Sequence, residues 1–135
     1  MKPGGGMLSH VTIAVSDVMA ALAFWEPLME RMGYPRSYWN PEAPAASFRD
    51  PDQSRPLFFL VRPFEGEPVP GNGPMVAFLA KDRATVDAVH AMALAAGATD
   101  EGAPRLRAYY HPSYYGAYFR DPDGNKICVV CHTPA

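Results

Sequence analysis

An internal repeat constrains the fold of this chain more than any other feature of its sequence. Residues 46–52 read Ala-Ser-Phe-Arg-Asp-Pro-Asp and residues 117–123 read Ala-Tyr-Phe-Arg-Asp-Pro-Asp, so six of seven positions agree. The segments that begin at His10 and at Met75 also correspond, because each alternates like a strand and then passes into a helical pattern. A repeat of this size indicates two copies of one supersecondary unit that bury a core together.

Length, charge and composition exclude several classes of protein. The 135 residues suit one compact domain, and with 48% hydrophobic residues the chain can form a substantial core. A net charge of −2 without a basic stripe argues against nucleic-acid binding, and the apolar runs are too short to span a membrane. Residues 1–7 have no apolar segment typical of a secretion signal, so we expect a flexible tail there. Cys128 and Cys131 are therefore expected to be free thiols in the cytoplasm.

The first copy, residues 8–62, has the pattern β-α-β-β-β. Residues 8–15 alternate as a half-buried strand, and Asp17 can cap the helix that follows and ends near Gly33. Pro27 lies inside this helical pattern and is expected to kink or split it. Three strands are predicted at 34–40, 45–49 and 56–62. Residues 63–74 are rich in proline and glycine and are expected to link the copies.

The second copy, residues 75–132, repeats this order. Asp82 can cap a helix that reaches Ala96, on which His90 is expected to face solvent. Strands are predicted at 105–111, 115–120 and 126–132, with a turn at Asp121-Pro-Asp-Gly124 between the last two. The predicted fold is therefore α+β, with tandem βαβββ modules forming curled mixed sheets around a cavity.

This layout resembles the vicinal oxygen chelate superfamily, which includes glyoxalase I, bleomycin-resistance proteins and extradiol dioxygenases. The resemblance is carried by Leu8-Ser-His10-Val-Thr-Ile, by Phe24-Trp25 and Gly33, and by Tyr118-Phe-Arg-Asp-Pro-Asp-Gly124-Asn-Lys-Ile. It covers residues 8–132 as a single domain. It implies a homodimer, often with sites built from both chains, that acts on or binds a small molecule.

The resemblance also implies four metal-ligand positions, which are usually His or Gln on each opening strand and Glu on each closing strand. In this sequence those positions map onto His10, Leu57, Met75 and Cys128, so only His10 fits the pattern. We expect no metal cofactor. A soft ion such as Cu(I) or Zn bound by His10, Met75 and Cys128 is the alternative.

Two of these residues are also candidate catalytic groups. His10 lies on the polar face of its strand, where it can bind a ligand, act as an acid or base, or remain a hydrogen-bonded relic of a metal site. Cys128 can act as a nucleophile if a neighbour lowers its pKa, or it can be a small buried apolar residue.

Aromatic residues gather around His111, where the second copy is longer. His10 and Met75 lie 65 positions apart, whereas Asp50 and Asp121 lie 71 apart, so six residues are added between these landmarks. Tyrosine offers a flat apolar face with a hydroxyl, which suits a pocket, although tyrosine also favours strands. The predicted substrate pocket comprises His10, Met75, Cys128, Tyr38, Trp39, Arg107, Tyr110, Tyr114 and Tyr115. Arg107 either holds an anionic substrate or lies in solvent.

Two functions remain open from the sequence. The first is a small-molecule binder with a degenerate metal site, similar to the drug-sequestering members of the superfamily. The second is a diverged lyase, isomerase or dioxygenase that acts on a small oxygenated or electrophilic substrate, with or without a metal. The missing carboxylates favour the binder, and the sequence leaves the ligand unidentified.

Overall fold

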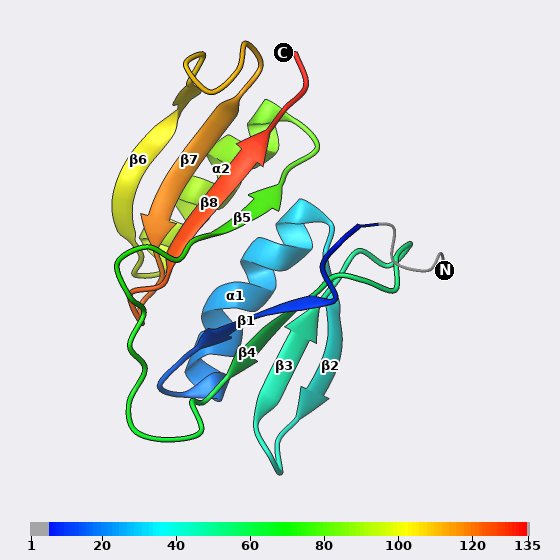
Figure 1. Ribbon diagram of the computed structural model, residues 1–135, viewed down its shortest axis with the longest axis vertical. Coiled ribbons are helices and arrows are strands. Elements are labelled where there is room, and N and C mark those ends of the chain that lie inside the picture. Colours follow the sequence, from blue (N-terminus) through cyan, green and yellow to red (C-terminus); the bar gives the residue numbers. More distant parts are fainter. Residues whose placement is uncertain (1–5, 135) are drawn as a thin grey trace. The chain divides into compact units, whose positions relative to one another are not determined.

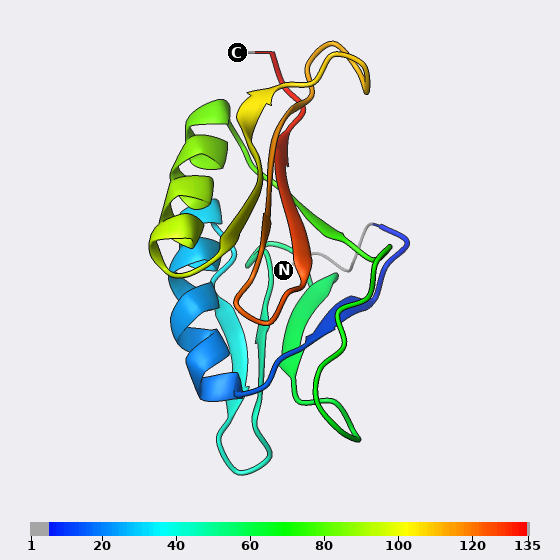
Figure 2. The same ribbon diagram turned by 90° about the vertical axis from the view of Figure 1, so that its left-hand side faces the viewer.

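In the computed structural model, which describes residues 6–134, the chain forms two compact units that divide between Pro70 and Gly71. Most of the expected tail, residues 1–7, lies outside the described residues. Each unit has one helix along one face of its own four-stranded mixed sheet, so the predicted pair of βαβββ modules is confirmed (Figure 1, Figure 2). Residues 63–74 contain no helix or strand.

Unit one has the strand order β1-β4-β3-β2, in which β1 and β4 are parallel and the other neighbours are antiparallel. Its elements are β1 (His10–Ala14), α1 (Val18–Met32), β2 (Arg36–Asn40), β3 (Ala45–Phe48) and β4 (Leu57–Val61). The Asp17 side chain accepts a hydrogen bond from the Ala20 N–H, and Gly33 ends the helix with a φ of 93°. Both ends of the helix follow the sequence prediction because a short acceptor and a left-handed glycine meet the needs of unpaired helix termini.

The helix α1 is not split at Pro27, contrary to one of the two outcomes expected from the sequence. Pro27 is exposed, whereas Trp25, Leu28 and Met29 on either side of it are buried. The Trp25 ring packs against Phe58 of the sheet with centroids 5.0 Å apart. Packing of this apolar face outweighs the one backbone hydrogen bond that proline removes.

Unit two repeats the topology with the strand order β5-β8-β7-β6. Its elements are β5 (Val76–Leu79), α2 (Arg83–Ala95), β6 (Thr99–Leu106), β7 (Tyr115–Arg120) and β8 (Lys126–Cys131). Alternation sends Ala117, Phe119, Ile127 and Val129 toward the core beneath α2, and all four are fully buried. The opposite face of the sheet carries the candidate site.

The repeated Arg-Asp-Pro-Asp motif forms the same turn in both units. Arg49 donates from Nη1 to the carbonyl oxygen of Gln53 at 2.9 Å, and Arg120 donates to that of Gly124 at 2.7 Å. In each copy the first aspartate accepts a hydrogen bond from the N–H of the second. The motif therefore stabilises a hairpin turn, which explains why it recurs without any need for shared chemistry.

The structure corrects the prediction for the first strand after α2. The predicted strand was 105–111, whereas β6 runs from Thr99 to Leu106. The first part of β6 contains Asp, Glu, Gly and Pro, which disfavour strands, so the sequence pattern does not indicate a strand there. They are tolerated because β6 is an edge strand with two register shifts against β7.

His90 is also placed differently from the prediction. Its side chain is buried instead of facing solvent, and its Nε2 lies 3.0 Å from Asp100 Oδ1. The interaction ties α2 to β6. The hydrogen bond from the Gly102 N–H, followed by the one from His90, lowers the pKa of Asp100.

Candidate functional site

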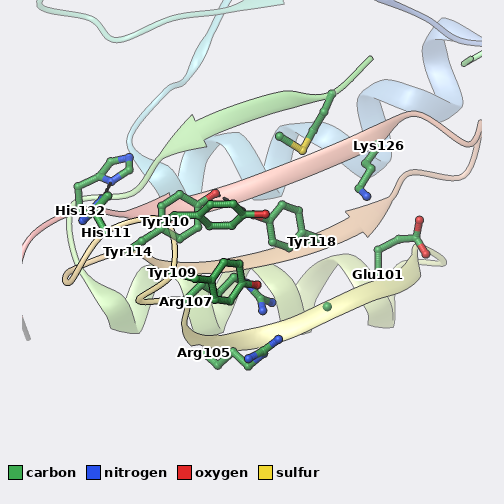
Figure 3. A pocket seen from close by; sticks show the side chains of 12 residues that line it. Glu101, Arg105, Arg107, Tyr109, Tyr110, His111, Tyr114, Tyr118, Lys126 and His132 are labelled. Atoms are coloured by element: carbon green, nitrogen blue, oxygen red, sulfur yellow. Dashed lines mark hydrogen bonds between the residues drawn. The ribbon is translucent and has the colours of Figure 1, made fainter. Parts of the chain in front are cut away.

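A cavity of about 620 Å³ opens on the sheet face of unit two that lies opposite α2 (Figure 3). Its wall combines one thioether, a group of tyrosines, two histidines and several charged side chains. The lining residues are Met75, Glu101, Gly102, Arg105, Arg107, Tyr109, Tyr110, His111, Tyr114, Tyr118, Lys126 and His132.

The aromatic part of the wall comes from the loop between β6 and β7. This loop is closed by a hydrogen bond from the Arg107 N–H to the Tyr114 carbonyl oxygen at 2.7 Å. The Tyr110 ring lies between those of Tyr109 and Tyr114, with centroid distances of 4.6 and 4.8 Å. Such tilted contacts stabilise the ring cluster beyond the area it buries. This loop is four residues longer than the one between β2 and β3, and its tyrosines supply the aromatic wall.

A hydroxyl network lies deeper in the sheet. The hydroxyl of Tyr114 is 2.8 Å from that of Tyr118 and 3.5 Å from Cys128 Sγ. Burial, followed by hydrogen bonding to Cys128 and Tyr118, raises the pKa of Tyr114. Burial likewise raises the pKa of the Cys128 thiol, in spite of the opposing effects of both tyrosines and of nearby cations. These groups are therefore held in their neutral forms around neutral pH.

Two glycines give this wall its shape. A Cβ on Gly116 would lie 2.8 Å from Cε1 of Tyr114, and a Cβ on Gly102 would lie 2.9 Å from Nη2 of Arg107. Both distances are shorter than van der Waals contact. The missing side chains therefore leave the space that the Tyr114 ring and the Arg107 guanidinium occupy.

The charged part of the wall is dominated by cations. The guanidinium carbon of Arg107 lies 4.9 Å from the centroid of the Tyr118 ring, and Nζ of Lys126 lies 5.7 Å from the same centroid. Both distances fall in the range of cation–π contacts. Glu101 is the only carboxylate among the lining residues and is paired with Arg120 at 2.9 Å. The remaining charge of the wall is positive.

Two histidines meet at the end of the cavity away from Lys126 (Figure 3). Nε2 of His111 lies 2.6 Å from Nδ1 of His132, and the rings stack at 4.8 Å. Nδ1 of His111 accepts the Ser113 N–H, which assigns the shared proton to His111 Nε2. His132 then keeps its own proton on Nε2.

Four of the residues predicted from the sequence to form a pocket line this cavity: Met75, Arg107, Tyr110 and Tyr114. The sequence left two alternatives for Arg107, a contact with an anionic substrate or a position in solvent. The residue is only 3% exposed, so the position in solvent is wrong. Cys128 is fully buried and lies behind Tyr114 instead of at the surface of the cavity.

Tyr115 does not line the cavity, contrary to the prediction. Its hydroxyl donates to Asp87 Oδ1 of α2 at 2.7 Å, and Arg83 of the same helix lies 5.1 Å from its ring centroid. The cause is the alternation of β7, which gives Tyr115 the same orientation as the buried Ala117 and Phe119.

The other predicted residues belong to unit one. His10 is exposed, its Nδ1 lies 2.9 Å from Ser9 Oγ, and its ring meets Phe59 edge-on at 5.8 Å. Tyr38 and Trp39 lie on β2, where Tyr38 is exposed. Convergence of His10, Tyr38 and Trp39 with the cavity of unit two stays a prediction.

The strand registers correct one of the four mapped ligand positions. Thr12 pairs with Phe59 in unit one, and its repeat partner Ala77 pairs with Cys128 in unit two. Phe59, and not Leu57, is therefore the counterpart of Cys128. The β3–β4 hairpin is two residues longer than the β7–β8 hairpin, which shifts the register by the same amount.

The residues at these positions do not fit a hard divalent ion. Phe59 offers no donor, Met75 offers a thioether, and Cys128 is a fully buried thiol whose pKa is raised. Hard cations require oxygen ligands, and a thiol binds metal only as thiolate. Within residues 6–134 no group of three or more His, Cys, Asp or Glu side chains is placed to hold a metal ion.

Several lining residues were not predicted from the sequence. Lys126 shares the parity of Cys128 on β8, and His132 continues that parity one residue beyond the end of the strand, so strand alternation is a usable signal for both. Glu101, Gly102 and Arg105 belong to the part of the chain where β6 was placed incorrectly. Tyr109, His111 and Tyr118 lie in the aromatic cluster but were left out of the predicted pocket.

A family profile described as a glyoxalase-like domain matches residues 10–130, nearly the whole chain. The chain belongs to this glyoxalase-like family. The resemblance inferred from the repeat and from the final hairpin is thereby confirmed. No protein of curated function matches the sequence.

Several solved structures resemble this glyoxalase-like protein over almost its full length. A glyoxalase/bleomycin resistance protein from Albidiferax ferrireducens T118 is 32% identical, with a TM-score of 0.82 and coverage of 93% of this chain and 99% of the other. A glyoxalase/bleomycin resistance protein/dioxygenase family enzyme from Burkholderia phytofirmans PsJN is 23% identical, with a TM-score of 0.68 and coverage of 95% and 100%. TioX from Micromonospora sp. ML1 is 18% identical, with a TM-score of 0.63 and coverage of 95% and 100%.

The described part of the chain contains no helix with the length and hydrophobicity that a membrane crossing requires.

Proposed function

We propose that this glyoxalase-like protein binds a small organic molecule in the cavity of unit two without the help of a metal ion. The observation that carries this proposal is the cavity itself, whose volume of about 620 Å³ falls within the usual range for small-molecule sites. The rings of Tyr109, Tyr110 and Tyr114 offer flat apolar surface, while hydroxyl and cationic groups nearby can orient a ligand.

The state of the thiol supports binding over covalent catalysis. A nucleophilic cysteine requires a lowered pKa and access to its substrate. Cys128 has neither, since burial raises its pKa and the Tyr114 hydroxyl lies against its sulfur. The donor set discussed above likewise supports a site that works without a hard metal ion.

We also propose a homodimer in the cytoplasm. Leu79 and Leu106 are large apolar residues of unit two that are exposed in the single chain, and a second copy can cover such surface. Cys128 and Cys131 are free thiols, which fits a reducing compartment.

The test is a ligand-observed NMR screen of aromatic fragments against protein purified without chelators, repeated after dialysis against EDTA. We expect hits whose affinity is the same in both preparations. The substitution Tyr110→Ala should weaken them about two- to tenfold, because an aromatic contact contributes about 0.5–1.5 kcal/mol. The matched control is Phe64→Ala, which removes a fully exposed aromatic ring outside the cavity.

Loss of every hit after EDTA treatment would contradict the metal-free part of the proposal. Hits that bind Tyr110→Ala as tightly as the parent protein would place the ligand outside this cavity.

A further inference from the structure

We propose that the ligand of this cavity is an aromatic carboxylate, with its carboxylate toward Arg107 and Lys126 and its ring against Tyr109, Tyr110 and Tyr114. The inference rests on the proposed function, since it names the class of molecule that the same cavity takes.

The charge of Arg107 carries the first step. Its side chain is buried, and Nη2 donates to the Ala103 carbonyl oxygen at 2.9 Å. Its Nε is covered, without a hydrogen-bond acceptor among the described residues. Within residues 6–134 no carboxylate lies within ion-pair distance of the guanidinium. A buried cation without a counter-charge is costly, and an anion bound on the cavity side would reduce that cost.

The neighbouring charges make the second step. Arg107 and Lys126 both lie within 6 Å of the Tyr118 ring, so two cations border the same part of the cavity. Arg105 adds a third cation to the wall. Glu101 lies near Lys126 at this end, but Arg120 holds it. The cavity therefore attracts a negatively charged group (Figure 3).

The distribution of side chains makes the third step. The tyrosine rings lie between the cationic end, at Lys126, and the histidine pair at the opposite end (Figure 3). A planar ring can stack on Tyr110 and Tyr114 while an attached carboxylate reaches the cations. A planar guanidinium matches the two oxygens of a carboxylate better than it matches an anion with a single charged atom.

The experiment compares sets of three probes that share one ring system and carry an anionic, a neutral or a cationic group. Naphthoate, naphthamide and naphthylmethylammonium, together with the corresponding biphenyl compounds, are titrated by ligand-observed NMR. We expect naphthoate to bind at least about tenfold more tightly than naphthamide, because hydrogen bonds to charged groups are stronger than neutral ones. The ammonium compound should bind most weakly. Of the three affinities, added salt should weaken only that of the carboxylate compound.

Two variants assign the preference to its residues. Arg107→Gln should reduce the affinity for naphthoate about tenfold and leave that for naphthamide unchanged. Arg83→Gln is the matched control, because Arg83 also has a covered Nε and also lies over a tyrosine ring, but on the α2 side of the sheet. If Arg107→Gln fails to fold, Lys126→Gln replaces it, with an expected loss of about threefold.

The outcomes separate the two proposals. If no probe binds, charged or neutral, the proposed function fails together with the inference. If naphthamide binds as tightly as naphthoate, or if Arg107→Gln and Lys126→Gln leave the preference intact, the inference is overturned while the binding function stands.

Discussion

The substitution Gly116→Ala tests the geometry of the cavity most directly. The new Cβ would lie 2.8 Å from Cε1 of Tyr114. The ring cannot turn aside freely, because its hydroxyl lies 2.8 Å from that of Tyr118 and 3.5 Å from Cys128 Sγ. The ring also packs against Tyr110 with centroids 4.8 Å apart. We therefore expect the variant to displace Tyr114 and to break the hydroxyl network.

The size of the effect follows from two opposing contributions. Overpacking a filled site costs about 1–3 kcal/mol. Replacing glycine by alanine on a permissive backbone returns about 0.4–1 kcal/mol by restricting the unfolded chain. The backbone of Gly116 lies outside the left-handed region, so this gain applies. The net expectation is a loss of about 0–2.6 kcal/mol in the free energy of unfolding.

Two measurements check this expectation. Urea denaturation followed by circular dichroism gives the change in stability. The rate of Cys128 modification by a thiol reagent, read by mass spectrometry to separate it from Cys131, reports whether Tyr114 still covers the sulfur. Gly73→Ala is the control, since Gly73 has no atom within 4 Å of the added Cβ and no positive φ. If both variants have the same stability and the same thiol reactivity, Tyr114 does not occupy the position described.

Three further predictions follow from single contacts or surfaces. Tyr115→Phe removes the hydrogen bond to Asp87 and should lower the stability by about 0.5–1.5 kcal/mol without changing ligand affinity, measured by denaturation and by the NMR titration. The lowered pKa of Asp100 means that its ionised form is favoured in the folded state, so its contribution to stability is present above the unfolded pKa and is lost as the pH falls through the lower folded value. Melting curves below about pH 4 should therefore fall less steeply with acid in Asp100→Asn than in the parent protein, and parallel curves would contradict this. Light scattering at micromolar concentration should give the mass of a dimer, whereas a monomer would remove the proposed pairing.

Much of the fold could be predicted because its signals are local. Asp17 and Gly33 bound α1 through contacts within a few residues of the chain. Each Arg-Asp-Pro-Asp motif closes its turn through bonds that span at most four residues. Such contacts can be predicted from a short stretch of sequence, because they do not depend on how the rest of the chain folds.

The candidate site was less predictable because its features depend on how strands pair. The edge position of β6 tolerates Pro104, which lies just before the strand predicted at 105–111 and within the observed one. The longer first hairpin moved the counterpart of Cys128 from Leu57 to Phe59, and the repeat alone carried no sign of that shift. The face that Tyr115 occupies follows from strand parity alone, because Tyr115, Ala117 and Phe119 alternate along β7.

The sequence by itself determined the two modules, their element order and the family. The tertiary structure decided that Arg107 is buried over Tyr118 and that Lys126 and Glu101 reach the same cavity. The physical reason is range. Caps, turns and alternation act between near neighbours in the chain, whereas the burial of a charge and the wall of a cavity depend on registers and bulges between strands that are distant in sequence.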